Sequence, residues 1–278
     1  MPSVAIQTWN LTKRYGAVEA LTDVSLQIPQ GQIFGFLGPN GAGKTTTIRL
    51  LFGLMRPTAG RAEVLGHDVN RDGPTARQSM SFLPSDNSLY HFMKVDQYLE
   101  AFARLTRGSH RRRSDLLERL EVDPSRKIGD LSMGNRQKVA IIRALQDDVP
   151  VYVVDEPTRG LDPLIQQAFF EMVREFRAFG GTVFMSSHIL SEVEELCERV
   201  AIIRDGVVVI TGVVDDLRAG RRRSAHVLFH TQAPDYLQSP GVEIVSRDGL
   251  QLELTVPADL NPLIQELSGY KIKDIVFK

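Results

Sequence analysis

The chain has 278 residues, which is long enough for one large α/β domain and a small second domain. Hydrophobic residues make up 42% and charged residues 24%, as in ordinary globular proteins. The net charge of −1 supplies no basic surplus, so we expect no nucleic-acid partner. Cys197 is the single cysteine and excludes an internal disulfide, and no apolar run approaches the roughly 18 residues of a membrane span.

The N-terminal part of the chain predicts short strands. Residues 4–9 and 21–28 alternate apolar and polar side chains with the period of two that is typical of half-buried strands. Tyr15 lies between them and directly follows two basic residues. Its ring is a candidate for stacking on an adenine base, and a tyrosine of the core or of a turn explains the position equally well.

The next segment carries the most specific motif. It reads GPNGAGKTT and fits the pattern G-x-x-x-x-G-K-[ST], between an apolar strand at 33–37 and an amphipathic segment at 46–54. Its glycines let backbone N–H groups approach phosphate oxygens, and a helix that begins near Lys44 directs its positive end at them. We therefore predict a nucleoside triphosphate site, with Lys44 on the β- and γ-phosphates and Thr45 on Mg²⁺. The candidate binding residues are Gly38, Pro39, Asn40, Gly41, Ala42, Gly43, Lys44, Thr45 and Thr46.

The middle of the chain predicts a largely helical region. Apolar positions recur with a helical period from about 95 to 120 and are interrupted near Gly108. A basic run, Arg111-Arg-Arg113, follows the interruption. We interpret this run as a solvated face, with contact to anionic lipid headgroups as the alternative. The elements expected before this region are a turn at 56–60, a strand pair at 61–69, a strand at 79–84 and a loop at 85–88.

Two polar segments follow at the ends of predicted elements. Residues 132–135 form a Ser/Gly-rich loop before a helix at 139–145, which is a second potential anion site, although many helices simply begin with a serine cap. Residues 149–156 form a continuous apolar strand that ends in Asp155 and Glu156, as expected of a strand covered on both faces. Beside a phosphate loop, we interpret these acids as a Mg²⁺ carboxylate and a base that activates water.

The remaining elements of the large domain are indicated by start and turn signals. Asp162-Pro163 predicts the start of a helix that reaches about residue 179. The strand after it ends in Ser186-Ser-His188, which places His188 at the sheet edge that would carry the phosphates, unless it is a structural histidine. The last elements are a strand at 182–185, a helix at 189–198 and a hairpin at 200–210.

The C-terminal residues predict a separate small unit. Residues 213–224 are interpreted as a connector, and residues 225–278 predict the order β-α-β-β-α-β of a ferredoxin-like domain. Its first helix is expected at 234–238 and its second at 259–267. Because about 60 residues form only a marginal core, we expect this unit to lean on the large domain or on a copy of itself.

Taken together, five motifs resemble the ATP-binding subunit of an ABC transporter over about residues 4–212. They are GPNGAGKTT, LSMGN, VYVVDE, GLD and SSH, in the order and spacing of that family. The resemblance implies an α/β P-loop ATPase fold, with a mixed sheet and a helical subdomain at about 86–145. It further implies that Tyr15 stacks on adenine, Asp155 holds Mg²⁺, Glu156 is the general base and His188 contacts the γ-phosphate. The signature-loop residues that it places on ATP are Ser132 and Gly134.

The sequence departs from the family pattern at two sites. Ser85 stands where the family carries glutamine, and its short side chain would reach Mg²⁺ only through a water, so Asp86 is the alternative ligand. The signature loop lacks the first of its usual two glycines and replaces the usual glutamine, but it keeps Ser132 and Gly134. Because Glu156 and His188 are present, we expect weakened but not abolished hydrolysis.

The resemblance implies ATP and Mg²⁺ as cofactors, a second ATP-binding subunit, with a homodimer expected, and a permease on separate chains. It places the chain in the cytoplasm, on the inner face of the cell membrane. The small C-terminal unit resembles the accessory domain of ATPases of the ABC-2 and drug-exporter type, which implies export. Two alternatives are a soluble ATPase with the same head and a regulatory module that holds ATP without turning it over.

Overall fold

The computed structural model describes residues 3–86, 89–106, 111–219, 223–257 and 260–277. The chain forms two compact units, Met1–Gly212 and Val213–Lys278. The larger unit contains a six-stranded sheet in the order β11-β10-β4-β9-β8-β7, in which the five strands from β10 to β7 run parallel. Its strands are β4 (Ile33–Leu37), β7 (Met80–Leu83), β8 (Val151–Asp155), β9 (Thr182–Ser187), β10 (Arg199–Arg204) and β11 (Val207–Val213).

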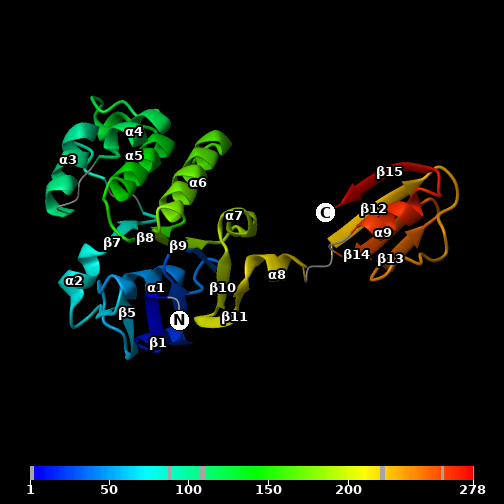
Figure 1. The fold of residues 1–278 in the computed structure, drawn as a ribbon, viewed down its shortest axis with the longest axis horizontal. Helices are drawn as coiled ribbons and strands as arrows, with labels where there is room; N and C mark the ends of the chain where they lie inside the picture. Colours follow the sequence, from blue (N-terminus) through cyan, green and yellow to red (C-terminus); the bar gives the residue numbers. More distant parts are fainter. Residues whose placement is uncertain (1–2, 87–88, 107–110, 220–222, 258–259, 278) are drawn as a thin grey trace. The chain divides into compact units, whose positions relative to one another are not determined.

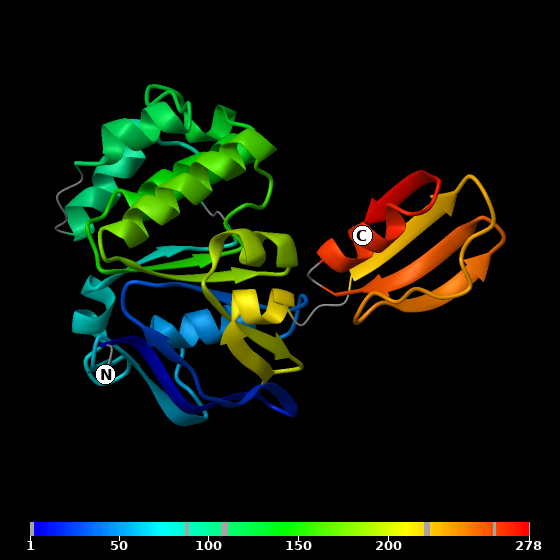
Figure 2. The same ribbon diagram turned by 45° about the vertical axis from the view of Figure 1, so that its right-hand side comes forward.

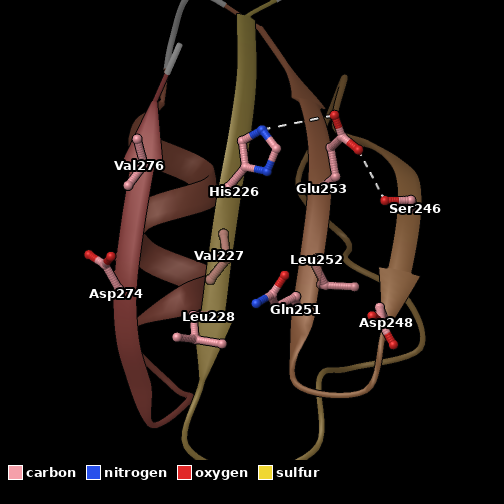
Figure 3. Close-up of a pocket in the computed structure, with 10 residues that line it drawn as sticks. All are labelled: His226, Val227, Leu228, Ser246, Asp248, Gln251, Leu252, Glu253, Asp274 and Val276. Carbon is pink, nitrogen blue, oxygen red and sulfur yellow. Dashed lines mark hydrogen bonds and ion pairs between the residues drawn. The ribbon is translucent and has the colours of Figure 1, made fainter.

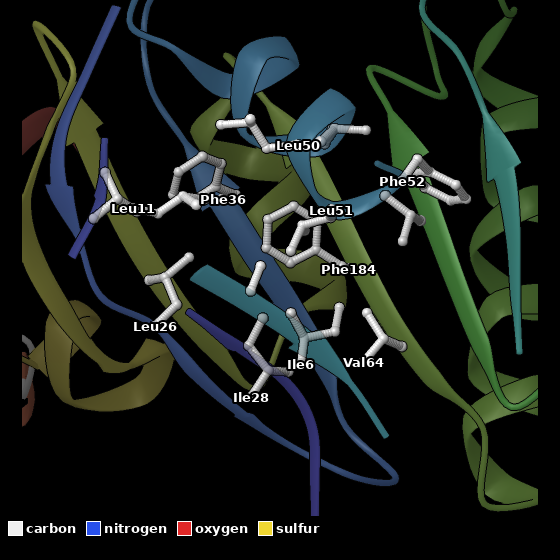
Figure 4. Packing of buried hydrophobic residues seen from close by; sticks show 14 of the residues in the cluster. Ile6, Leu11, Leu26, Ile28, Phe36, Leu50, Leu51, Phe52, Val64 and Phe184 are labelled. Carbon is white, nitrogen blue, oxygen red and sulfur yellow. The ribbon is translucent and has the colours of Figure 1, made fainter. Parts of the chain in front are cut away.

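A second sheet packs on one face of the first. It has the order β2-β1-β5-β6, with β3 paired to β1, and all of its pairs are antiparallel. The core between the two sheets includes Phe36 and Phe184, whose ring centroids lie 5.4 Å apart, together with Ile6 and Leu51 (Figure 4). Its strands are β1 (Val4–Tyr15), β2 (Val18–Val24), β3 (Gln27–Pro29), β5 (Ala59–Val64) and β6 (His67–Asp68).

Helices cover the six-stranded sheet. A group made of α3, α4, α5 and α6 lies on one face, and α1 lies on the other face with the second sheet (Figures 1 and 2). Apolar runs without alternation in β4, β8 and β9 are buried throughout, as expected of strands covered on both faces. The helices of this unit are α1 (Lys44–Leu51), α2 (Gly73–Gln78), α3 (Val95–Thr106), α4 (Arg113–Arg119), α5 (Met133–Leu145), α6 (Pro163–Ala178) and α7 (Leu190–Leu196), with a 3₁₀ turn at Ile128–Asp130.

The basic run at 111–113 is only partly the solvated face that its charge suggested. Arg111 is exposed, but Arg113 is only 20% exposed, and its guanidinium donates to Glu100 of α3 at 2.9 Å and to Gln146 at 2.9 Å. These contacts join α4 to α3 and to the end of α5, so Arg113 stabilises the helical group. The predicted break near Gly108 lies outside the described residues, and the segment on either side of it forms the separate helices α3 and α4.

Cys197 occupies a packing position beside the central strand β4. Its side chain is buried, and a Cβ placed on Gly35 would lie 3.1 Å from its sulfur. Burial raises the pKa of the Cys197 thiol, and the nearby acids Glu198 and Glu192 add to this effect. The residue therefore behaves as a small hydrophobe.

The C-terminal unit contains a four-stranded antiparallel sheet in the order β13-β14-β12-β15. Helix α9 covers one face through Leu263 and Leu267, which join a core with Val227 and Leu254, and the other face carries polar side chains (Figure 3). The described elements are α8 (Val214–Ala219), β12 (Arg223–Phe229), β13 (Glu243–Asp248), β14 (Gln251–Val256), α9 (Asn261–Leu267) and β15 (Ile272–Phe277).

Two expectations for this unit were wrong. No helix forms at 234–238, so the described order is β-β-β-α-β. The backbone there stays non-helical, because the carboxylate of Glu266 accepts the N–H groups of Gln238 at 2.6 Å and Ser239 at 2.8 Å. Arg247 also donates to the carbonyl of Ala233 at 2.9 Å. Within the predicted connector 213–224, the structure forms α8 and the start of β12.

Candidate nucleotide site

The phosphate loop lies between the end of β4 and the start of α1, and close packing requires two of its glycines, Gly38 and Gly43. A Cβ on Gly38 would lie 2.3 Å from the carbonyl oxygen of Ile203, and one on Gly43 would lie 2.8 Å from that of Ala20. Gly43 also has a φ of 106°, which side chains rarely allow. Close packing at Gly38 and Gly43 therefore fixes the loop in a curve before the start of α1, the arrangement that binds phosphate in loops of this kind.

Lys44 is the first residue of α1 and is 5% exposed. Its ammonium donates to the carbonyls of Gly38 at 2.7 Å and Pro39 at 3.1 Å, so the side chain folds back over its own loop. The same ammonium lies 3.5 Å from Oε1 of Glu156. A cation held in this position would attract an anion that enters the loop.

Three hydroxyl groups converge on Asp155, the buried last residue of β8. Thr45 from α1 donates to Oδ2 at 2.9 Å, and Ser85 from the end of β7 donates to the same oxygen at 3.0 Å. Ser186 from β9 donates to Oδ1. One carboxylate and two neighbouring hydroxyls form a set of hard oxygen donors, which suits Mg²⁺. Asp86 does not share this position and lines a separate hollow of about 270 Å³ with Met133.

Glu156 follows β8 in an unusual backbone conformation. Its φ is 49°, a region that costs a non-glycine residue about 1–3 kcal/mol, and its N–H donates to the carbonyl of Ser186 at 3.1 Å. Oε1 of Glu156 lies 3.2 Å from Nδ1 of His188, which follows β9. The turn out of β8 thus places the carboxylate between Lys44 on one side and His188 on the other.

Several of these groups line one cavity of about 690 Å³, and Lys44 and Asp155 contact members of its lining. It lies at the carboxyl ends of parallel strands, where open α/β sheets bind their ligands. Its lining includes Asn40, Thr45, Ser85, Glu156, Ser187 and His188. The structure therefore brings together the predicted phosphate loop, both acids and the predicted histidine.

Tyr15 and the signature loop do not line this cavity. Tyr15 is 47% exposed at the end of β1, where its hydroxyl contacts the sulfur of Met55 at 3.1 Å and Lys13 lies over its ring. Ser132 caps α5, and its hydroxyl accepts the N–H of Asn135 at 3.2 Å. Gly134 lies in the first turn of α5, against the carbonyl of Gly160. The predicted signature residues thus belong to a different surface from the cavity of their own chain.

Sequence reasoning missed several polar residues that support the site. Ser186 and Ser187 end β9 fully buried, and Thr158 and Glu192 are also buried nearby. Ser186 holds Asp155, while Ser187 and Thr158 contact Glu192. A pair of serines at the end of an otherwise apolar strand was the available signal, because buried hydroxyls need partners.

Comparison with known families decides the identity of this arrangement. The family model described as ABC transporter matches residues 21–159, which is half of the chain and runs from β2 to the segment after Glu156. The chain belongs to the ABC transporter family. The matched region of this chain contains the phosphate loop, the signature loop and the two acids at the end of β8, in this order.

Relatives and solved structures agree with this assignment. The chain is 37% identical over 225 residues to "Daunorubicin resistance ATP-binding protein DrrA3" of Streptomyces coeruleorubidus, covering 79% of this chain and 71% of that one. It is 31% identical over 277 residues to "Uncharacterized ABC transporter ATP-binding protein YhcH" of Bacillus subtilis, covering 96% and 90%. An ATP-binding cassette solved as a dimer in a post-hydrolysis state with ADP and Pi superposes with a TM-score of 0.69 at 25% identity, covering 75% and 98%.

This protein is an ATP-binding and ATP-hydrolysing subunit of an ABC transporter. The relatives favour this function over the alternatives of a soluble ATPase and a regulatory module. In the described part of the chain, no helix has both the length and the apolar character to cross a bilayer.

Proposed function

We propose that two copies of this chain face each other head to tail and enclose ATP at their interface. In this arrangement Lys44, Thr45 and Asp155 of one copy hold the nucleotide, and Ser132 and Gly134 of the other copy close over it. The observation that carries the proposal is the position of Glu156 between Lys44 and His188, on a cavity that its own signature loop does not line. The site of a single chain is therefore half complete.

The chemistry follows from the positions of the side chains. Glu156 takes a proton from the attacking water, because its carboxylate is fixed between two partners and opens onto the cavity. Lys44 exchanges its contacts with Gly38 and Pro39 for the β- and γ-phosphates, and His188 contacts the γ-phosphate. Mg²⁺, held by Thr45 and Asp155 with Ser85 beside them, would neutralise the charge that develops on the phosphates.

We further propose that Tyr15 stacks on the adenine ring. Its aromatic face is 47% exposed at the end of β1, so a base can reach it without displacing the core. Lys13 lies 5.2 Å from the centroid of the ring, which keeps a positive charge beside the same surface. Substitution of Tyr15 by alanine should raise the Kd for ATP by about fivefold and leave the Kd for free triphosphate unchanged.

The membrane partner is proposed from the family. A separate permease would receive the movement of the dimer, with the chain bound at the inner face of the cell membrane, and the segment 85–107 is the proposed docking surface. A relative named for daunorubicin resistance favours export. Copurification with an integral membrane protein tests this part. If variants of the exposed Phe92 bind the permease normally, the segment 85–107 is not the docking surface.

A complementation experiment tests the head-to-tail arrangement. Glu156→Gln and Ser132→Ala are prepared as separate full-length chains, and each alone should hydrolyse ATP slowly. The mixed dimer has two nucleotide sites, of which one carries both defects and the other carries none. Random pairing in an equal mixture leaves about a quarter of all nucleotide sites intact, so about a quarter of the bound ATP should be hydrolysed at the normal single-turnover rate. If each chain completed its own site, mixing would restore nothing and the proposal would fail.

A further inference from the structure

Glu192 is a buried acid that the mechanism above does not use. It lies in α7, four residues after His188, and its side chain is 4% exposed. Oε1 accepts the hydroxyl of Thr158 at 2.5 Å, and Oε2 accepts the hydroxyl of Ser187 at 2.7 Å. Both carboxylate oxygens are therefore engaged by hydroxyl groups from two different segments, and the side chain also borders the cavity.

The two segments that Glu192 joins are the ones that carry the catalytic groups. Thr158 lies two residues after Glu156, and Ser187 directly precedes His188. The Ser187 hydroxyl also accepts the N–H of Ile189 at 2.9 Å, so it fixes the backbone on both sides of the histidine. His188 itself is 42% exposed, and its Nδ1 lies 3.2 Å from Oε1 of Glu156. Its position is thus set mainly through the backbone that Ser187 anchors.

We infer that Glu192 is a positioning residue for hydrolysis, because it clamps the loop of His188 to the loop that follows Glu156. This inference rests on the roles proposed for Glu156 and His188. Without the clamp, the loop of His188 can shift, while the phosphate loop, which lies outside the clamp, still binds ATP. Misplacement of catalytic groups by about 1 Å can cost 100-fold in rate. The loss should therefore appear in kcat rather than in KM.

Three variants of the full-length protein test the clamp. Glu192→Ala should lower kcat for ATP by about 10- to 100-fold and change KM by less than about twofold. Glu192→Gln should stay within about threefold of the parent, because its amide oxygen accepts one hydroxyl and its NH₂ donates to the other. Glu195→Gln is the matched control on the same helix, where the side chain is exposed and pairs with Arg174. Its kcat should match that of the parent.

Thermal unfolding separates positioning from a loss of structure. If Glu192→Ala and Glu192→Gln lose kcat equally, or if the loss of kcat is accompanied by an equal rise in KM, the clamp is not the cause and the inference is overturned. An unchanged kcat in Glu192→Ala overturns it as well. Partial rescue by glutamine at an unchanged melting temperature supports it.

Combination with His188→Ala distinguishes this inference from the proposed function. If Glu192 acts through His188, adding Glu192→Ala to His188→Ala should cost less than about twofold more. A full multiplicative loss would show that Glu192 acts elsewhere and would overturn the inference while the role of His188 stands. If His188→Ala alone keeps the parent kcat, the proposed role of His188 fails, and the inference fails with it.

Discussion

The two units of the molecule differ in where their sheets carry polar side chains. In the ATP-binding unit, polar side chains are buried at one edge of the six-stranded sheet, where Asp155 and Ser186 are 1% and 0% exposed. In the C-terminal unit they spread over the open face of the four-stranded sheet (Figure 3). There His226 and Glu253 lie 3.9 Å apart, and their side chains are 44% and 40% exposed.

The difference follows from topology. A parallel sheet covered on both faces has no room for polar groups except at its strand ends, and several strands meet at the same edge. An antiparallel sheet that is covered by a helix on one face exposes its second face to water. Water molecules then hydrogen-bond to the polar groups of that face separately. The first arrangement holds side chains in fixed positions for chemistry, and the second does not. The predictions below test this contrast, beginning with the largest expected effect.

Glu156→Gln removes the base at the buried edge. We expect kcat for ATP to fall by about 1000-fold, within the range of a positioned general base, and ATP to hold the protein as a closed dimer. Steady-state phosphate release and size-exclusion chromatography with ATP measure the two effects. The matched control is Glu253→Gln on the open face, which should stay within about twofold of the parent. A fall of kcat in Glu253→Gln, or an unchanged kcat in Glu156→Gln, would contradict the contrast between the two sheets.

Leu254→Ala tests whether the C-terminal unit has a core of its own. Leu254 is fully buried in β14 with Val227 and Leu263, so we expect a loss of about 2–5 kcal/mol that is confined to this unit. Hydrogen exchange of β12 and β14, followed by mass spectrometry, should show this loss while strands of the ATP-binding unit keep their protection. Leu250→Ala serves as the control, because Leu250 is 46% exposed. Equal destabilisation by both variants would contradict the assigned core.

Glu266 makes the stability of the C-terminal unit depend on pH. Desolvation raises the pKa of its carboxyl, but hydrogen bonds from Ser239 and Gln238 outweigh this effect and leave the pKa below its ordinary value. The stabilisation is therefore complete above the unfolded pKa of about 4.3 and is lost as the pH falls through the lower folded value.

Glu266→Ala should thus lower the stability of the C-terminal unit by about 1 kcal/mol at pH 7 and by little once the pH is below the folded pKa of this carboxyl. Urea titrations followed by NMR signals of Tyr270 and its neighbours measure both values. Gln265→Ala on the exposed face of the same helix is the control. A difference between Glu266→Ala and the parent that grows on acidification would have the wrong sign for this account.

Ser85→Ala removes one of the three hydroxyls on Asp155. We expect about a two- to fivefold rise in the Mg²⁺ concentration needed for half-maximal hydrolysis, the equivalent of one hydrogen bond. Removal of Mg²⁺ by a chelator should abolish hydrolysis in both proteins. Ser79→Ala, just before the other end of β7, controls for effects on the strand. A parent-like response to Mg²⁺ in Ser85→Ala would show that this hydroxyl is dispensable at the site.

Features with strict local requirements could be predicted from the sequence. The phosphate loop needs glycine at Gly38 and Gly43, because other residues collide with Ile203 and Ala20. The buried strands β4, β8 and β9 follow from uninterrupted apolar runs bounded by turn or polar residues. Five motifs in one order then indicated the family, which the comparisons confirmed.

Features that depend on distant partners could not be predicted. Arg113 belongs to a basic run that is indistinguishable from a solvated one until Glu100 and Gln146 are placed beside it. The stretch 234–238 has a proline at its start and reads as a short helix, but Glu266, far along the chain, accepts the N–H groups of Gln238 at its end and of Ser239 after it. Helix α2 begins at Gly73-Pro74, which reads equally well as a turn.

The burial of Cys197 makes the native protein ready for site-directed labelling. Since it is the single cysteine and its thiol is packed beside β4, thiol reagents should not react with it. No cysteine-free variant therefore has to be made first. A cysteine introduced in place of Met133, which is 66% exposed next to Ser132, would then be the reactive position. Spin labels there would report the separation of two facing copies as nucleotide is added.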